Sequence, residues 1–454
     1  MITSNSTVMT FFLKETRRQI ESNDPRLGRL FVGQSAANYY PHDGDWGRDG
    51  RGIGENEHIK ELLLSSDLGS LASLRQDDFR AFCDGIAGNS SIERLEMFCY
   101  DLFGGEIFRM LTPFFEQNSN LRRLWISGGG TRGIRRLSFR RPASLNNAQL
   151  LSASLSRFNT LKEFECKCCD LLDGEVEVLI RALAGHPGIS RISFSGNEVG
   201  GRGAAEMSAL LLTNPNSSLE WLNLSSCFLD DSGADILAAA LGRNTMLKKL
   251  NLEGNRNISV IGWWAFAAAL RNPNSALISV NLRGNLLDDV ALSSFAYSLA
   301  HNNVLKELYL DRNEGNTTNR GWDAFSNALC NKTSINATFN SNHTLRRILQ
   351  SANDSQLPSD VRILLQLNRE NTTTEAARRK ILDVHFSSGV FSMQPFIDMD
   401  LKVLPHAVAW MTRDEHGSSL LYKFVRNTTF LLNIGSGGTE SEGEPKSKRQ
   451  KVKA

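Results

Sequence analysis

A short apolar phrase recurs along most of this chain, and its spacing constrains the fold more than any other feature. Successive copies begin 28, 30, 28, 30, 28 and 30 residues apart. A fixed period of this length is the signature of a solenoid, in which each repeat buries its apolar face against its neighbours. We therefore expect function on an extended surface made by stacking rather than in one buried pocket. The copies begin at Leu161, Ile189, Leu219, Leu247, Leu277, Leu305 and Ile335.

Each copy follows the pattern apolar-x-x-apolar-x-apolar-x-x-Asn/Cys. The copy that begins at Leu247 continues with Leu250, Leu252 and Asn255. Successive side chains of a strand point to opposite faces, so the fourth and sixth positions are predicted in the core and the third and fifth outside it. The Asn side chain is expected to satisfy backbone groups of the following turn, which would be costly to bury unpaired. Two copies carry cysteine in this position, namely Cys169 and Cys227.

Stretches rich in Ala and Leu fill the other half of each unit. Gly233–Arg243 and Ile261–Arg271 are predicted to be helices because small and straight-chain residues are good helix formers. Glycine recurs where these helices should end, as at Gly242. The acidic pairs Asp230-Asp231 and Asp288-Asp289 recur just after the strand, where Asp is a natural helix N-cap. We therefore interpret them as caps and not as catalytic acid–base pairs.

This pattern resembles the leucine-rich repeat family in its ribonuclease-inhibitor-like form, which has a strand and a full helix per repeat. The same repeat class occurs in Ran GTPase-activating proteins and in the sensor ends of nucleotide-binding innate-immune receptors. The resemblance covers roughly three quarters of the chain. It implies an α/β solenoid, a horseshoe with parallel strands on the concave face and helices on the convex face, plus a small helical C-terminal region. Function does not follow from this fold, which serves many unrelated binding tasks.

Degenerate repeats are predicted before Leu161, with strands that open at Leu27, Ile59, Ile92 and Leu121. The glycine-rich segment Trp46–Leu62 is interpreted as a poor helix that enters a strand, in preference to a phosphate-binding loop. The Leu121 copy is about 40 residues long and holds the basic insertion Gly128–Arg141. This insertion is either a binding loop or a tolerated surface insertion, and it lacks the lysine and hydroxyl order of a P-loop.

Four regions are predicted along the chain. Residues 1–26 form an N-terminal helical cap, 27–344 the solenoid, 345–434 a helical C-terminal cap or extension, and 435–454 a disordered basic tail. The third region either closes the last repeat or offers a second binding surface. Its predicted helices are Val361–Glu370 with Ser359 or Asp360 near the N-cap, Thr374–Phe386, Leu401–Met411 with a kink or break at Pro405, and Ser418–Val425.

Composition excludes several classes of protein. A net charge of +2 with 22% charged residues does not predict a broad nucleic-acid footprint. No apolar run of about 18 residues exists, so no membrane span is expected, and the start lacks the pattern of a secretory signal. Seven cysteines, an odd number, favour a reducing compartment. We therefore expect an intracellular protein, nuclear or cytoplasmic.

No catalytic or metal-binding constellation is recognised. Cys166-Lys167-Cys168-Cys169 suggests a metal site, but the repeat places Cys166 and Cys169 in the core and only Cys168 outside, and no second ligand pair is visible. The eight histidines are scattered, as at His186, His301 and His343, and are interpreted as loop or turn residues. We predict no enzyme activity and no cofactor.

The outward positions of the strands are the predicted site. Exposed Trp, Tyr and Arg on a rigid surface dominate interface energetics, and their mixed charges suit a protein partner better than a phosphate backbone. The alternative is that these aromatics only cover neighbouring strands. The wider set comprises Arg94, Glu96, Phe98, Arg123, Glu163, Glu165, Asn223, Asn251, Glu253 and Glu307. The residues predicted to bind the partner are Trp125, Arg191, Trp221, Lys249, Arg283, Tyr309 and Asp311.

The basic tail resembles a monopartite nuclear-import signal, which would engage a nuclear-import receptor; the alternative is a solvated charged tail. We predict a non-enzymatic scaffold that binds a protein partner on the concave face. The alternative is a GTPase-activating regulator of a Ran-like small GTPase, although that family typically ends in an acidic tail and this chain ends basic. The residues of the predicted import signal are Lys446, Lys448, Arg449, Lys451 and Lys453.

Overall fold

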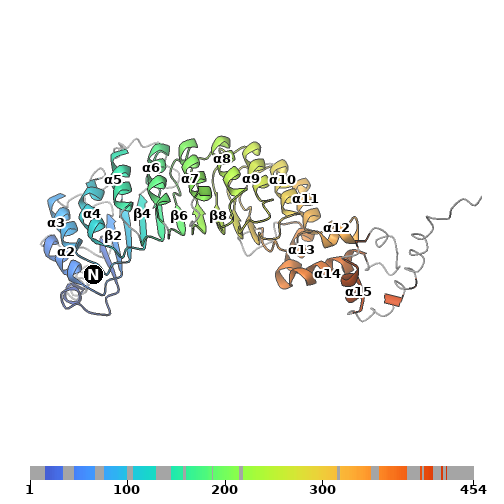
Figure 1. Ribbon diagram of the computed structural model, residues 1–454, viewed down its shortest axis with the longest axis horizontal. Helices are drawn as coiled ribbons and strands as arrows, with labels where there is room; N and C mark the ends of the chain where they lie inside the picture. The colour runs from blue at the N-terminus through green and yellow to red at the C-terminus, as the bar shows by residue number, and fades with distance from the viewer. Residues whose placement is uncertain are drawn as a thin grey trace, which may run out of the picture.

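The chain folds into a curved solenoid in which strands line one face and helices cover the other (Figure 1). The predicted strand and helix alternation is therefore confirmed. The computed structural model describes residues 16–33, 45–66, 76–99, 106–128, 145–156, 160–186, 188–213, 218–313, 317–348, 357–385, 399–400, 403–412, 421–422 and 426.

Ten strands form one parallel sheet whose spatial order follows the chain from β1 to β10. Equivalent residues of adjacent repeats are register partners, as Leu222 is with Leu250. Each position of the repeat therefore forms a row that runs along the sheet. The strands are β1 (Arg29–Gly33), β2 (Glu61–Ser66), β3 (Arg94–Cys99), β4 (Arg123–Gly128), β5 (Glu163–Lys167), β6 (Arg191–Ser193), β7 (Trp221–Asn223), β8 (Lys249–Asn251), β9 (Ser279–Asn281) and β10 (Glu307–Tyr309).

One helix follows each strand and packs on the convex side of the sheet (Figure 1). The predicted caps are confirmed, because Asp230 accepts from the Gly233 amide and Asp288 from the Ala291 amide. Trp46–Glu55 is helical and leads into a strand, as predicted for that glycine-rich segment. The helices are α2 (Trp46–Glu55), α3 (Gln76–Ile86), α4 (Glu106–Gln117), α5 (Leu145–Leu155), α6 (Asp173–Ala184), α7 (Gly201–Thr213), α8 (Asp231–Leu241), α9 (Val260–Ala269), α10 (Asp289–Leu299) and α11 (Asn319–Leu329).

A single apolar core runs between the two layers, and a ladder of asparagines closes it after the strands. Asn255 donates to the carbonyl oxygens of Leu224, at 2.8 Å, and Leu252, at 2.9 Å, while its own oxygen accepts from the Cys227 amide. The Cys227 thiol takes the equivalent place one repeat earlier and donates to the Phe194 carbonyl at 3.2 Å. This confirms the predicted role of the Asn/Cys position in satisfying backbone groups.

A second row of buried amides lies where each helix returns to the sheet, and the sequence analysis did not identify it. Asn302 donates to the Leu270 carbonyl at 2.7 Å and accepts from the Leu305 amide at 2.7 Å. Such a side chain bonds the turn of the preceding repeat and positions the next strand; Asn56 makes only the second of these bonds and Asn368 only the first. The members include Asn56, Asn89, Asn118, Asn244, Asn272, Asn302, Asn342 and Asn368.

The seventh strand predicted at Ile335 is wrong, because this residue begins helix α12 (Ile335–Phe339). Ser334 caps the helix by accepting from the Ala337 amide at 3.1 Å, which favours helix over strand. The sheet continues instead at Arg347, which bridges Glu307 of β10.

Three further helices follow: α13 (Ser359–Glu370), α14 (Thr373–His385) and α15 (Leu404–Thr412). The predicted helix start with Ser or Asp near the N-cap is confirmed, since Ser359 and Asp360 lie in the first turn of α13 directly after Pro358 at the N-cap. The predicted kink or break at Pro405 is wrong, because this proline lies in the first turn of α15, where no intrahelical amide bond is needed. Of the predicted helix Ser418–Val425, only Leu421 and Tyr422 are described.

The two ends of the solenoid are covered by helical segments. At the start, residues 16–21 are helical, Ile20 is buried in the core and Arg17 pairs with Asp49 at 2.8 Å. At the other end, Leu345 and Ile348 belong to the same core as the repeats. The four predicted regions stay predictions. Within the described ranges, no helix has the length and apolar character needed to cross a membrane.

Candidate functional site

On β4, β5 and β6 the outward third positions form a row in which a carboxylate lies between two arginines. The Glu163 carboxylate lies between two arginines, 3.3 Å from Arg123 Nε and 3.8 Å from Arg191 Nε. The three residues are register partners on β4, β5 and β6. Exposed pairs of this kind contribute little to stability, so the row leaves polar side chains free to exchange partners. The predicted mixture of charges is thus present on one continuous surface.

Trp125 is the centre of a cluster on β3, β4 and β5. Its ring centroid lies 5.9 Å from that of Phe98, and the Lys167 amine lies 5.4 Å above it. Lys167 was not among the predicted residues, although it occupies the same outward seventh position as Phe98 and could have been found by that rule. Burial raises the pKa of the Glu165 carboxyl, which is the register partner of Trp125, against the opposing effect of Lys167 and Arg191.

One outward prediction near this cluster needs correction. Glu96 lies in the same row as Trp125, yet only 3% of it is exposed. Its carboxylate pairs with Arg94 in the next outward position of the same strand. Neighbouring side chains therefore cover Glu96, and it is not available at the surface.

Trp221 and Arg191 form the second centre of the concave face. The Arg191 guanidinium lies over the Trp221 ring, 4.1 Å from its centroid, and the two residues are register partners on β6 and β7. The exposed Lys249 is the next partner of Trp221, on β8. Three of the predicted residues therefore lie on adjacent strands, and the Arg191 guanidinium stacks on the aromatic ring.

The remaining predicted residues lie at the β9 and β10 end of the sheet. Arg283 Nε is 3.6 Å from the Asp311 carboxylate, and the latter is buried on the concave side. Tyr309 is half-buried, and burial together with Glu307 raises the pKa of its hydroxyl. The fold brings these three together, but Asp311 is covered by its neighbours rather than exposed as predicted. Asn223, also predicted outward, is buried as well.

The cysteine cluster follows the predicted burial only in part. Cys166 is buried as predicted, whereas Cys169, predicted in the core, is half-buried and its thiol donates to the Lys167 carbonyl at 3.1 Å. Cys168 is half-buried in a left-handed backbone conformation with φ of 50°. In the part of the chain that the structure describes, no group of three or more His, Cys, Asp or Glu side chains is arranged to hold a metal ion.

A buried lysine lies beside His343, and the sequence analysis missed it. Lys380 of α14 is 1% exposed and donates to the carbonyl oxygens of Leu329, at 2.7 Å, and Asn342, at 3.1 Å. It also donates to His343 Nδ1 at 3.2 Å. Burial lowers the pKa of the Lys380 amine to about 7, and burial together with Lys380 lowers that of His343 to about 4. This lysine ties α14 to the last repeats.

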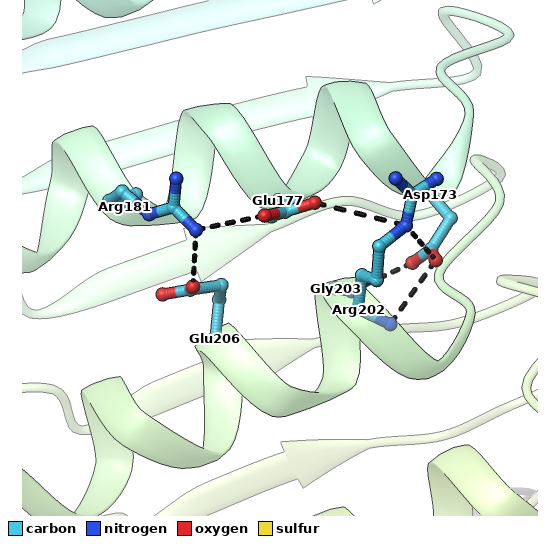
Figure 2. Close-up of polar contacts among 6 residues, drawn as sticks. All are labelled: Asp173, Glu177, Arg181, Arg202, Gly203 and Glu206. Atoms are coloured by element: carbon cyan, nitrogen blue, oxygen red, sulfur yellow. Dashed lines mark hydrogen bonds and ion pairs between the residues drawn. The ribbon is translucent and has the colours of Figure 1, made fainter.

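The convex seam between α6 and α7 is closed by a polar network (Figure 2). Asp173 at the start of α6 accepts from the Gly203 amide at 2.7 Å and so caps the next helix, α7. Arg181 bridges Glu177 of its own helix, at 2.8 Å, and Glu206 of α7, at 2.7 Å.

The capping bond to the next helix recurs every second repeat. Asp173, Asp231 and Asp289 lie 58 residues apart, and each caps the following helix. Asp231 accepts from the Ser259 amide at 2.7 Å, and Asp289 from the Thr318 amide at 2.7 Å. The alternation of 28 and 30 residues is therefore matched by an alternation of helix caps.

Comparison with known proteins identifies relatives of one repeat class. No family model matches the chain. The chain is 33% identical over 143 residues to the human "NACHT, LRR and PYD domains-containing protein 12", which covers 32% of this chain and 13% of that protein. It is 29% identical over 166 residues to the ribonuclease inhibitor of Sus scrofa, which covers 37% of this chain and 36% of the inhibitor.

Among solved structures, a chain of the yeast Rad7 and Elc1 complex is similar with a TM-score of 0.42 and 16% identity, over 71% of this chain and 74% of that chain. Of the two curated relatives reported above, the human protein and the inhibitor, the chain spans well under half of the length.

Proposed function

We propose that this chain, a leucine-rich repeat solenoid of the ribonuclease-inhibitor type, is a non-enzymatic scaffold that binds a protein partner on its concave face. The observation that carries the proposal is the Arg191–Trp221 stack beside Lys249 in the middle of the sheet. Tryptophan and arginine held on a rigid surface are the residue types that contribute most to protein interfaces. The parallel sheet supports them because each is fixed by its register partners.

The charge pattern of this face favours a protein over a nucleic acid. Acidic and basic side chains alternate along the row from Arg123 through Glu163 to Arg191. A phosphate backbone would be repelled by the carboxylates, whereas a protein surface can offer both signs of charge. The ribonuclease inhibitor of Sus scrofa is named for its action on an enzyme, and we transfer from this relative only the class of partner, a protein.

The test is an affinity capture that compares the native chain with a Trp221→Ala/Tyr309→Ala variant. Proteins retained from a cell extract are identified by mass spectrometry, and the binding of each is then measured with purified components. We expect the partner to bind the native chain and to be lost by the folded double variant. The matched control is Ile363→Ala, which removes an exposed apolar side chain from α13, outside the strands of the sheet. Equal binding by both variants and the native chain would contradict the proposal.

Two further predictions accompany this one. GTPase activation is tested by adding the chain to a Ran-like GTPase loaded with GTP, where unchanged hydrolysis would reject that alternative. Neither curated relative reported above is named as a GTPase-activating protein. The import signal at Lys446–Lys453 lies outside the described residues. Its proposed role in nuclear entry is tested by replacing Lys448 and Arg449 with Ala and imaging the tagged chain in cells.

A further inference from the structure

The helix α9 is apolar on all sides, including the side that faces solvent. Its sequence, VIGWWAFAAA, contains no charged or polar side chain. Ile261 and Trp264 each leave 68% of their surface exposed. A helix that is apolar all round normally lies buried, and large exposed apolar patches mark interaction sites. The outer face of α9 therefore lacks the cover that its composition requires.

The neighbouring helix α10 extends this apolar surface. Val290 is 61% exposed and Tyr297 is 62% exposed. A groove of about 590 Å³ runs between the two helices, with Trp264 on one side and Tyr297 on the other. Small side chains, Ala268, Ser293 and Ser294, also line it and leave it open. Its volume lies within the range of specific ligand sites.

The α6 and α7 seam is joined by charged side chains. Arg181 and Glu206 join those two helices directly (Figure 2). Helix α9 has no charged residue, so no ion pair of its own can cross to α10. Among the described residues, the α9 and α10 seam therefore differs from the α6 and α7 seam in having no ion pair that closes it.

The charged groups that line the groove select the chemistry of an occupant. The Asp289 carboxylate is already engaged by the Thr318 amide, at 2.7 Å, and by its hydroxyl, at 2.6 Å. Two arginines also line the groove, Arg271 and Arg320. The Arg271 guanidinium lies 5.4 Å from the centroid of Tyr297. Arg271 lies beside Tyr297 at the C-terminal end of α10, and Arg320 lies beside Asp289 at its N-terminal end, so carboxylates at the two ends of an occupant would each meet one guanidinium group.

We propose that the groove between α9 and α10 docks an acidic amphipathic helix of a partner protein. Its apolar side chains would pack between Trp264 and Tyr297, and its carboxylates would pair with Arg271 and Arg320. This is the helix-in-groove mode of recognition, in which apolar anchors recur at helical spacing. The surface lies on the convex side, so it is independent of the concave face and would let the solenoid hold two partners at once.

The test uses the full chain and a fluorescein-labelled helical peptide of about 18 residues, with Leu at positions i, i+3, i+4 and i+7 and Glu at the flanking positions. A matched peptide carries Lys in place of Glu. Fluorescence anisotropy should show that the acidic peptide binds at least about tenfold more tightly than the basic one. Trp264→Ser should weaken this binding about thirtyfold. Ile363→Ser, which changes an exposed residue of α13, should have no effect.

Charge reversal is the second arm of the test. The Arg271→Glu/Arg320→Glu variant should prefer the basic peptide, whereas Arg243→Glu, an exposed change outside the groove, should not alter the preference. Trp221→Ala should also leave peptide binding unchanged, which separates this proposal from that on the concave face.

Three outcomes would overturn the proposal. Failure of the native chain to bind either peptide is the first. Binding that is equal for the two peptides, or lost equally in Ile363→Ser, is the second. A monomer–dimer equilibrium in sedimentation velocity that Trp264→Ser abolishes is the third, because a second copy of the chain would then cover the groove.

Discussion

The Arg191 guanidinium carbon lies 4.1 Å from the centroid of the Trp221 ring, and the two residues are register partners on adjacent strands. They are 30 positions apart in the chain. Parallel stacking of repeats makes them neighbours, as it does Arg123 and Glu163. A stack of this kind contributes about 0.5–1 kcal/mol at an exposed site.

Trp221→Ala should therefore cost little stability. The ring is half-exposed, and its loss removes the stack with Arg191 but leaves no cavity in the core. We expect a decrease in the free energy of unfolding of about 1 kcal/mol or less, measured by urea unfolding followed by circular dichroism. A decrease comparable to that of a core leucine would show that the tryptophan supports the sheet instead of serving the surface.

Leu250→Ala should be far more damaging, because Leu250 is buried on the opposite face of β8. Truncation of a buried leucine leaves a cavity and costs about 2–5 kcal/mol. Since each repeat packs only on its neighbours, hydrogen exchange should increase most in β7, β9 and the helices next to them. The matched control is Lys249→Ala on the same strand. A similar decrease in its free energy of unfolding would show that Lys249 and Leu250 do not lie on opposite faces of β8.

Gly262→Ala should destabilise the chain although alanine is the better helix former. A Cβ atom at Gly262 would lie 2.7 Å from Asp231 Oδ1 and 2.6 Å from Ile258 Cγ2, so the capping bond between α8 and α9 would have to move. We expect a cost of about 1–3 kcal/mol in thermal unfolding. Gly201→Ala meets no atom within 4 Å and should be neutral or stabilising by a few tenths of a kcal/mol. Equal effects at the two glycines would contradict the account of the cap.

Lys380→Met should alter how stability depends on pH. Burial lowers the pKa of the Lys380 amine from 10.5 to about 7, so the unfolded state binds more protons than the folded state between these values. The contribution of this group to stability therefore rises with pH across that window, by up to about 1.4 kcal/mol per pH unit. The free energy of unfolding of the native chain, minus that of the variant, should therefore increase with this slope between pH 7 and pH 9.

The matched control for this prediction is Lys332→Met, which changes an exposed lysine near the same end of the solenoid. Its stability should follow that of the native chain at every pH. Both lysines also lower the pKa of the buried Cys330 thiol, so all three chains are compared in a Cys330→Ala background. Parallel curves for the native chain and Lys380→Met in urea unfolding would show that the Lys380 amine keeps its ordinary pKa.

Much of the fold could be predicted because its signals are local. A few neighbouring residues are enough to predict the strand that follows Leu247, the helix cap at Asp230 and the hydrogen bond of Asn255 in the asparagine ladder. The prediction failed at Ile335, where the apolar spacing matched a strand but Ser334 capped a helix. A short apolar spacing is compatible with either element, and there the cap decided between them.

The sequence by itself determined the repeat unit, the parallel order of the strands and the side of the sheet on which Arg191, Trp221 and Lys249 lie. These follow from a period of 2 within a strand and of 28 to 30 residues between strands. Only the tertiary structure decided which outward side chains stay accessible. In the folded chain, neighbouring side chains cover Glu96 and Asp311, whereas Trp264 is exposed. Accessibility depends on side chains that stacking brings together from about 30 positions away, and a pattern read along one repeat does not contain those contacts.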